Sequence, residues 1–280
     1  MSAVDIDNIV QDVLAAYDIL SVPVDPLSIA REEGICLLPG EYDNCFDGRI
    51  ECREDEGRLN FYLFYAEVRP VFRPESRVRF SIAHELGHYY LPRHREILLS
   101  GCSHSSHSDF VSDKNLEREA DSFAASLLMP HELFVDEVRS RSGGYCTLKD
   151  LIELANHTFN TSITSTALRY AHLNFEACCV VLSRAERVLY SVRSEDMKSM
   201  GLGYVAKGVK LPKHSVTAKQ LSVAPSRVEM STLEGTVHSD LWFDSGRRIP
   251  LWEEAIRLGG TGLTLTFLTP ENKDDDRDDD

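Results

Sequence analysis

The segment 84–88 reads His-Glu-Leu-Gly-His, and it constrains the fold more than any other part of the chain. Two histidines four residues apart share one face of an α-helix, so both imidazoles can reach a single cation only if this segment is helical. The flanking residues favour that helix, because apolar side chains recur at helical spacing over residues 78–90 and Pro92 ends the pattern. The sequence therefore predicts a helix that carries His84 and His88 as metal ligands.

Glu85 stands beside the first of these histidines. A carboxylate in this place can accept a proton from a water molecule that the metal activates, because a bound zinc ion lowers the pKa of water from about 15.7 towards 7. The pattern therefore predicts Glu85 as the general base of a hydrolytic reaction. The alternative is a surface helix with two solvated histidines, which the apolar neighbours Ile82, Ala83 and Leu86 disfavour.

A third protein ligand must come from elsewhere, since a catalytic zinc usually keeps three protein ligands and one open position. The segment 115–121 offers Glu117 and Glu119, and residue chemistry alone leaves both open. Glu117 and Asp121 are four residues apart and share a helical face. If Glu117 binds the metal, Asp121 is placed to accept the free ring N–H of a ligand histidine and to fix its tautomer.

Two longer stretches surround these residues. Residues 79–88 read Arg-Phe-Ser-Ile-Ala-His-Glu-Leu-Gly-His, and residues 117–130 read Glu-Arg-Glu-Ala-Asp-Ser-Phe-Ala-Ala-Ser-Leu-Leu-Met-Pro. In motif and order they resemble the ImmA/IrrE metallopeptidases, over residues 10–175. The resemblance implies that Glu117, and not Glu119, is the third ligand.

Members of that family cleave helix-turn-helix repressors. The resemblance therefore implies a zinc-dependent endopeptidase that acts on a protein substrate, a helix-turn-helix repressor or antitoxin-type regulator, and so derepresses stress or mobile-element genes. Affinity orders alone do not select Zn²⁺, so Mn²⁺ or another divalent metal stays open as the cofactor.

The expected fold class is α+β, in four parts along the chain. Residues 1–130 are expected to form a zincin-like metallopeptidase domain of helices and a small sheet. Residues 131–175 read as a helical, helix-turn-helix-like segment, and residues 176–270 as a β-rich C-terminal domain. Residues 271–280 form an acidic tail, expected to be disordered because like charges repel and nothing apolar is there to pack.

The strands are predicted from runs of β-forming residues bounded by turns. In the first domain they lie at residues 35–38, 49–52 and 58–65. In the C-terminal domain they lie at residues 178–183, 187–192, 226–231, 234–243 and 262–268. Within the first set, residues 59–63 could present a strand edge to which a substrate peptide adds, although a plain core strand explains them equally well.

A DNA-binding transcriptional regulator is the rival hypothesis, because residues 151–172 can be read as helix, turn, helix. The second of these helices offers Arg169 and His172 but few other donors for phosphates and base edges. The net charge of −15 also opposes binding to nucleic acid. Direct DNA binding is therefore the weaker hypothesis, and a non-catalytic sensor that uses the C-terminal domain is a third class.

Other polar residues near the motif have plainer explanations. Residues 93–114 are expected to form a loop, and the Cys and His residues at 102, 104 and 107 within it fit no common zinc pattern. His94 and His131 are expected at the surface. Three side chains are candidates for stabilising an oxyanion: Tyr89, Tyr90 and His107.

The chain is expected to be cytoplasmic and not to contact a membrane. Residues 1–20 contain no Lys or Arg, unlike a secretory signal, and no run approaches the ~18 apolar residues of a membrane span. The seven cysteines are odd in number and form no C-x-x-C pair. Such a set favours reduced thiols in the cytosol.

Overall fold

A computed structural model describes most of the chain. The described residues are 1, 3–42, 46–67, 74–100, 114–142, 145–222, 231–259 and 261–271. Three predicted features fall outside them: the acidic tail beyond residue 271, the Cys and His residues at 102, 104 and 107, and nearly all of the strand expected at 226–231.

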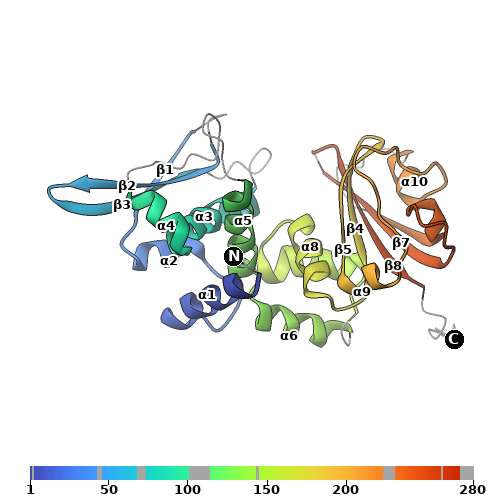
Figure 1. Ribbon diagram of the computed structural model, residues 1–280, viewed down its shortest axis with the longest axis horizontal. Helices are drawn as coiled ribbons and strands as arrows, with labels where there is room; N and C mark the ends of the chain where they lie inside the picture. The colour runs from blue at the N-terminus through green and yellow to red at the C-terminus, as the bar shows by residue number, and fades with distance from the viewer. Residues whose placement is uncertain are drawn as a thin grey trace. The chain divides into compact units, whose positions relative to one another are not determined.

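The chain is α+β, as the sequence predicts, and it divides into two compact units (Figure 1). Unit 1 comprises Met1–Glu137 and Leu154–Ser162, and it is mainly helical with a small sheet. Unit 2 comprises Val138–Glu153 and Ile163–Asp280, and it is built on a larger sheet. The order of a helical domain followed by a sheet domain is therefore confirmed, and the helical segment 131–175 contributes residues to both units.

Unit 1 is built from helices around a three-stranded sheet. Its α-helices are α1 (Ala3–Ala16), α2 (Pro26–Glu32), α3 (Glu75–Tyr90), α4 (Pro92–Leu99), α5 (Lys114–Leu128) and the start of α6 (His131–Ser142), and η1 (Leu154–Phe159) is a π-helix. Its strands are β1 (Cys36–Gly40), β2 (Gly48–Asp55) and β3 (Arg58–Ala66). Helix α4 corrects the first part of the loop expected at 93–114, because Pro92 at the first position of α4 starts a new helix directly after α3. Residues 101–113 of that expected loop lie outside the described residues.

The three strands of unit 1 have the order β1-β3-β2. Strand β1 runs parallel to β3, and β2 pairs antiparallel with β3 through a tight turn at Glu56 and Gly57, both with positive φ. Residues 59–63 belong to β3, the middle strand. Residues 62 and 63 pair with both β1 and β2, as a core strand would, whereas residues 59–61 pair with β2 alone in the described register. Strand β2 is the edge strand that packs against α3.

Unit 2 is a five-stranded antiparallel sheet with helices on both faces. Its strands are β4 (Cys179–Arg184), β5 (Arg187–Arg193), β6 (Thr232–His238), β7 (Pro250–Leu258) and β8 (Leu263–Pro270), in the order β5-β4-β8-β7-β6. Its helices are the end of α6, α7 (Leu148–Glu153), α8 (Ile163–Leu173), α9 (Glu195–Ser199), α10 (Val216–Ser222) and the short 3-10 helix η2 (Ser239–Leu241). In Figure 1 the strands β4, β5, β7 and β8 stand between α8 and α10.

Two adjacent acids in β7 form hydrogen bonds to helices on opposite faces of the sheet. Successive side chains of a strand point to opposite faces. Glu253 accepts hydrogen bonds from the backbone and hydroxyl of Thr217 in α10, and Glu254 accepts one from the backbone N–H of Leu148 in α7. Both acids are buried, so each acts as a polar anchor for a helix on its own face.

Strand β7 was not predicted from the sequence, and Glu253 and Glu254 are the reason. Glu253 and Glu254 look like solvated charges in the printed sequence and interrupt the apolar pattern, whereas the fold supplies buried partners for both. The strand expected at 234–243 is shorter, because η2 follows β6. The other described strands were predicted to within a few residues.

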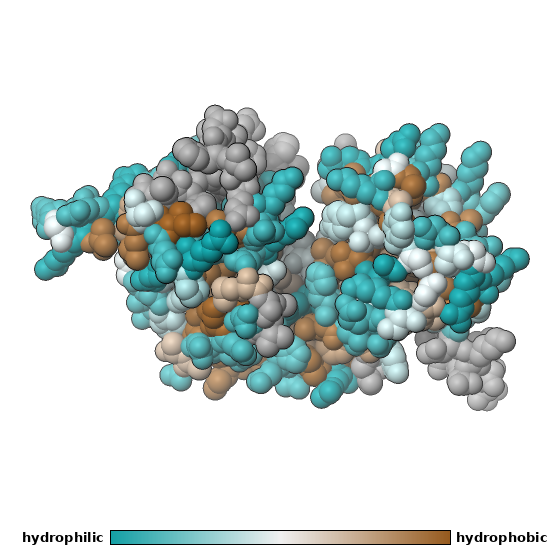
Figure 2. Space-filling view, viewed as in Figure 1, coloured by the Kyte–Doolittle hydropathy of each residue, from teal (hydrophilic) through white to brown (hydrophobic). Residues whose placement is uncertain are grey.

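Each unit has its own hydrophobic core. In unit 1 it joins α1, α2, α3 and α5 to the sheet. In unit 2 a cluster lies between the sheet and a covering layer formed by α9, α10 and the segments 200–211 and 241–243. Hydrophilic residues cover much of the visible face of both units, with hydrophobic residues scattered among them (Figure 2). Among the described residues, no helix has the length and apolar character to cross a membrane.

Candidate metal centre

Three side chains from two helices of unit 1 converge on one point. His84 and His88 project from α3, and Glu117 projects from α5. His84 Nε2 lies 3.1 Å from His88 Nε2 and 3.3 Å from Glu117 Oε2, and His88 Nε2 lies 3.8 Å from Glu117 Oε1. One ligand atom from each residue falls within 4.8 Å of the others, so this group could hold a metal ion.

The spacing of these atoms fits a tetrahedral divalent cation. Imidazole nitrogens and carboxylate oxygens bind zinc at about 2.0–2.2 Å, which places neighbouring ligand atoms about 3.3–3.6 Å apart. The measured separations of 3.1 to 3.8 Å bracket that range. Two histidines and a glutamate are also a ligand set of catalytic zinc sites, which keep a fourth position open.

Close packing of α3 against α5 brings the third ligand into range. Gly87 faces α5, where a Cβ added to it would lie 3.2 Å from Ala120 Cα and 3.3 Å from Ala120 O. Backbone yields less easily than a flexible side chain, so a side chain at residue 87 would press the two helices apart by a few tenths of an ångström. Glu117 stands one turn before Ala120, and the glycine therefore sets how near its carboxylate comes to the histidines.

Asp121 lies where its spacing from Glu117 predicts. Its Oδ1 is 2.9 Å from His84 Nδ1, the ring nitrogen that does not face the other ligands. A carboxylate accepts hydrogen bonds, so in the neutral form of the ring this contact keeps the proton on Nδ1 and leaves the Nε2 lone pair for a cation.

Glu85 occupies a closed place between α3 and the start of β2. It is buried and accepts a hydrogen bond from the backbone N–H of Ile50. Gly48 makes room for it, because a Cβ there would lie 3.0 Å from Glu85 Cγ and 3.2 Å from Glu85 Oε1. Helix α3 therefore presents the two histidines and this carboxylate beside the edge strand of the sheet.

Burial and the neighbouring charges shift two pKa values at the centre. Burial, opposed by the charge of His84 and helped by that of Glu117, raises the pKa of Glu85 to about 7. Burial acts against a charged His84 ring, but hydrogen bonds to Asp121 and Glu117 outweigh it and raise the pKa of His84 to about 10. The anionic surroundings thus favour a positive charge at the ligand atoms, whether a proton or a metal ion carries it.

A known protein family matches the part of the chain that contains these site residues. Residues 73–162 match the family model Peptidase_M78, described as the IrrE N-terminal-like domain. Over these residues the chain is similar to that domain, and we refer to residues 73–162 as the IrrE-like domain. The ImmA/IrrE resemblance of the sequence is thus confirmed, and the IrrE-like domain contains all five predicted site residues: His84, Glu85, His88, Glu117 and Asp121.

Other comparisons reach further along the chain. Among curated proteins no relative matches. A solved structure of a Mycobacterium tuberculosis transcriptional regulator matches with a TM-score of 0.58 and 13% identity, covering 94% of this chain and 86% of that one. At this identity the match shows a shared fold, which extends beyond the IrrE-like domain into unit 2.

The structure corrects the expected surroundings of two side chains near the centre, His94 and Glu119. His94 is buried in α4, not exposed, and its Nδ1 lies 3.0 Å from His88 Nδ1. Glu119 is not simply a solvated helix charge, because its Oε2 lies 3.0 Å from His94 Nε2. His131 is exposed, as expected. The helical start at Pro92, with His94 and Leu98 four residues apart, was the sequence signal for a buried His94.

The two tyrosines that follow the motif, Tyr89 and Tyr90, donate hydrogen bonds to the carboxylate of Glu33. The hydroxyls of Tyr89 and Tyr90 donate to the two oxygens of Glu33, each at 2.7 Å, and Tyr17 donates to the same carboxylate. Both hydroxyls therefore donate to Glu33, the residue at the C-terminal end of α2. This arrangement does not support a role for Tyr89 or Tyr90 in stabilising an oxyanion. The third candidate, His107, lies outside the described residues.

Zinc binding to the IrrE-like domain is expected to release a proton. Because the pKa of His84 is raised to about 10 before a metal binds, the ring holds a proton through the neutral range, and the cation must displace it. Affinity should therefore rise by about tenfold per pH unit up to about 10 and then level off. Calorimetry in two buffers of different ionisation enthalpy measures the released proton, and an affinity independent of pH would contradict the expectation.

Proposed function

We propose that the chain is a zinc-dependent endopeptidase that cleaves a helix-turn-helix repressor or antitoxin-type regulator. The observation that carries the proposal is the triangle of His84, His88 and Glu117 with Glu85 beside it, inside an IrrE-like domain. A hydrolytic metal site needs three protein ligands and a nearby base, and this group offers both.

The residues have separate roles in the proposed reaction. His84, His88 and Glu117 hold the cation, and Asp121 orients the ring of His84. When bound, a divalent cation supplies Lewis-acid polarisation of a carbonyl group and acidifies water. Glu85 accepts a proton at its carboxylate and returns it to the departing amine, for which a pKa of about 7 is suited because both protonation states are accessible near neutral pH.

The edge strand β2 is the proposed place for the substrate backbone. It lies beside α3, and the backbone N–H of Ile50 already faces Glu85. An extended peptide that adds to a sheet edge gains backbone hydrogen bonds without regard to its sequence. A peptide laid along β2 would therefore pass the carboxylate of Glu85 with its carbonyl groups aligned.

The proposed place of action is the cytoplasm. Within the described part of the chain, Cys36, Cys52, Cys178 and Cys179 are free thiols. Disulfides are rare in cytosolic proteins, so free thiols agree with that compartment.

The direct test is incubation of the purified full chain with the helix-turn-helix repressor encoded nearest to its gene. Cleavage is expected with zinc and is expected to stop with a chelator, because the base at Glu85 has no activated water to deprotonate without the cation. Mass spectrometry of the products identifies the severed bond. An intact repressor after prolonged incubation with the zinc-loaded chain would count against this substrate class.

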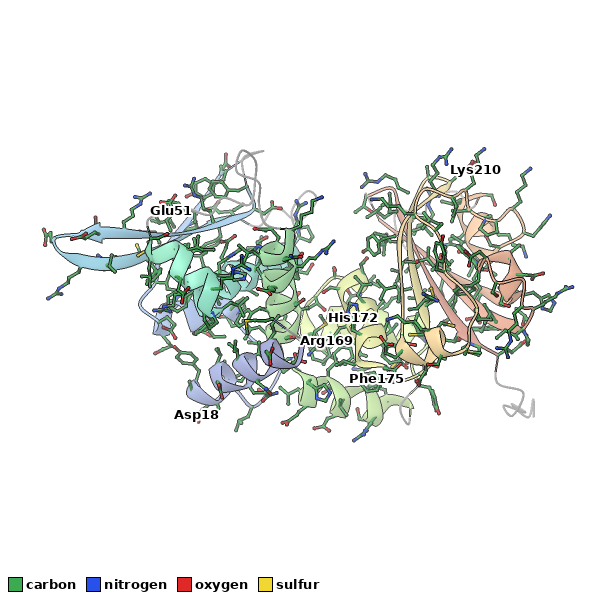
Figure 3. All side chains as sticks on the ribbon, viewed as in Figure 1. Asp18, Glu51, Arg169, His172, Phe175 and Lys210 are labelled. Carbon is green, nitrogen blue, oxygen red and sulfur yellow. The ribbon has the colours of Figure 1, made fainter. Side chains whose placement is uncertain are left out.

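The DNA-binding alternative has less support from unit 2. Arg169 and His172 both lie on α8, where Figure 3 labels them, but Arg169 is buried and thus offers little to a phosphate. The chain also carries a net charge of −15. A gel-shift titration at moderate salt with the promoter of the neighbouring gene separates the two classes, since sequence-specific retardation by this chain alone would favour a regulator.

A further inference from the structure

His94 connects the ligand His88 to a carboxylate on another helix. Its ring is completely buried, with 0% of its surface exposed. His94 Nδ1 lies 3.0 Å from His88 Nδ1, and His94 Nε2 lies 3.0 Å from Glu119 Oε2. The other oxygen of Glu119 accepts from the amino group of Met1.

The direction of these hydrogen bonds follows from the chemistry of their ends. Glu119 as a carboxylate can only accept, so His94 donates from Nε2 and a neutral His94 ring has a lone pair at Nδ1. That lone pair must accept from His88, which places the proton of His88 on its Nδ1. The Nε2 lone pair of His88 then points towards His84 and Glu117.

We propose that His94 and Glu119 are positioning residues that fix the tautomer and orientation of His88 for the metal. The inference rests on the metal site of the proposed function. The two ligand histidines are then supported differently: His84 by the exposed carboxylate of Asp121, and His88 by a buried neutral ring that a second carboxylate orients. A buried His88 N–H without an acceptor would be costly, so this support should matter to metal affinity.

Two substitutions of His94 separate acceptor chemistry from packing. Phenylalanine fills the volume but accepts no hydrogen bond, whereas the amide oxygen of glutamine can accept from His88 Nδ1. Loss of such a support typically weakens metal binding by about 10- to 100-fold. His94→Phe is therefore expected to lower Zn²⁺ affinity by about that factor, and His94→Gln is expected to restore much of the loss.

The experiment titrates the full-length variants with Zn²⁺ against a competing chelator and records the ¹⁵N signals of His88 to establish its tautomer. His131→Phe is the matched control, because His131 is an exposed histidine at the start of α6. Far-UV circular dichroism checks that each chain is folded. If His94→Phe does not fold, Glu119→Leu replaces it, and it should also weaken Zn²⁺ binding and shift the His88 proton partly to Nε2.

The outcomes separate this inference from the proposed function. Zn²⁺ binding by the parent chain and His131→Phe, with weaker binding by His94→Phe and recovery in His94→Gln, supports it. Equal affinities and an unchanged His88 tautomer in all folded variants would overturn the positioning role while leaving the metal site intact. Equal losses in His94→Phe and His94→Gln would overturn it too, because packing alone would then explain them. A parent chain that binds no Zn²⁺ would overturn the proposed function itself.

Discussion

Replacing Glu85 with glutamine is expected to lower the rate of repressor cleavage by about 100- to 10,000-fold, the usual contribution of a general base. The amide is almost the same size as the carboxylate, and its oxygen can still accept from the backbone N–H of Ile50. It cannot take up a proton from water at neutral pH. The initial rate of cleavage at saturating Zn²⁺ is the measurement.

The control for this variant is its metal content. Glu85 is not part of the group of three that could hold the ion, so Glu85→Gln should bind Zn²⁺ with nearly the parent stoichiometry. Folding should also be retained, as circular dichroism can show. A metal-loaded, folded Glu85→Gln chain that cleaves at the parent rate would remove Glu85 from the reaction.

Replacing His88 with alanine is expected to remove most of the bound metal and, with it, the cleavage activity. His88 supplies one of three ligand atoms, and its ring is buried between His84 and His94. Two remaining ligands bind a divalent cation far more weakly than three, and the alanine methyl group cannot replace the missing ring nitrogen. Metal analysis after dialysis against buffer measures the loss.

His131→Ala is the matched control for that variant, because it deletes an exposed histidine from α6 in the same unit. It should keep both the metal and the activity. A His88→Ala chain that retains the parent metal content would show that the cation binds elsewhere.

The metal helix could be predicted because its information is local. The spacing of His84 and His88 fixes a helical face, and Pro92 marks the end of α3. The third ligand was different: residue chemistry left Glu117 and Glu119 open, and only the family resemblance favoured Glu117. The structure shows why chemistry could not decide, since both carboxylates approach the centre, one at the ligand atoms of His84 and His88 and the other behind His94.

What could not be predicted depends on contacts between distant segments. His94 and Glu119 are separated by 25 positions, and Glu253 finds Thr217 across 36. In the printed sequence each of these polar side chains resembles a solvated group. In the fold His94, Thr217 and Glu253 are buried and Glu119 is half-buried. A buried polar group needs a hydrogen-bond partner, and here the partner comes from another helix or strand.

The edge of the small sheet is a further example. The strands of unit 1 could be predicted from β-forming residues, but their order could not, and residues 59–63 were open as either a strand edge or a core strand. The order depends on the pairing of β3 with both β1 and β2, which no local sequence pattern records. Strand β2 is the edge strand that contacts α3, so the proposed substrate strand lies next to Glu85.

The central claim is that His84, His88 and Glu117 hold one divalent cation. X-ray absorption at the zinc edge, on the full chain loaded with one equivalent of Zn²⁺, tests it most directly. We expect a shell of nitrogen and oxygen ligands at about 2.0–2.2 Å that includes the scattering of two imidazole rings. A sulfur shell at about 2.3 Å, or a shell with no imidazole contribution, would place the metal on cysteines or elsewhere and would contradict the account.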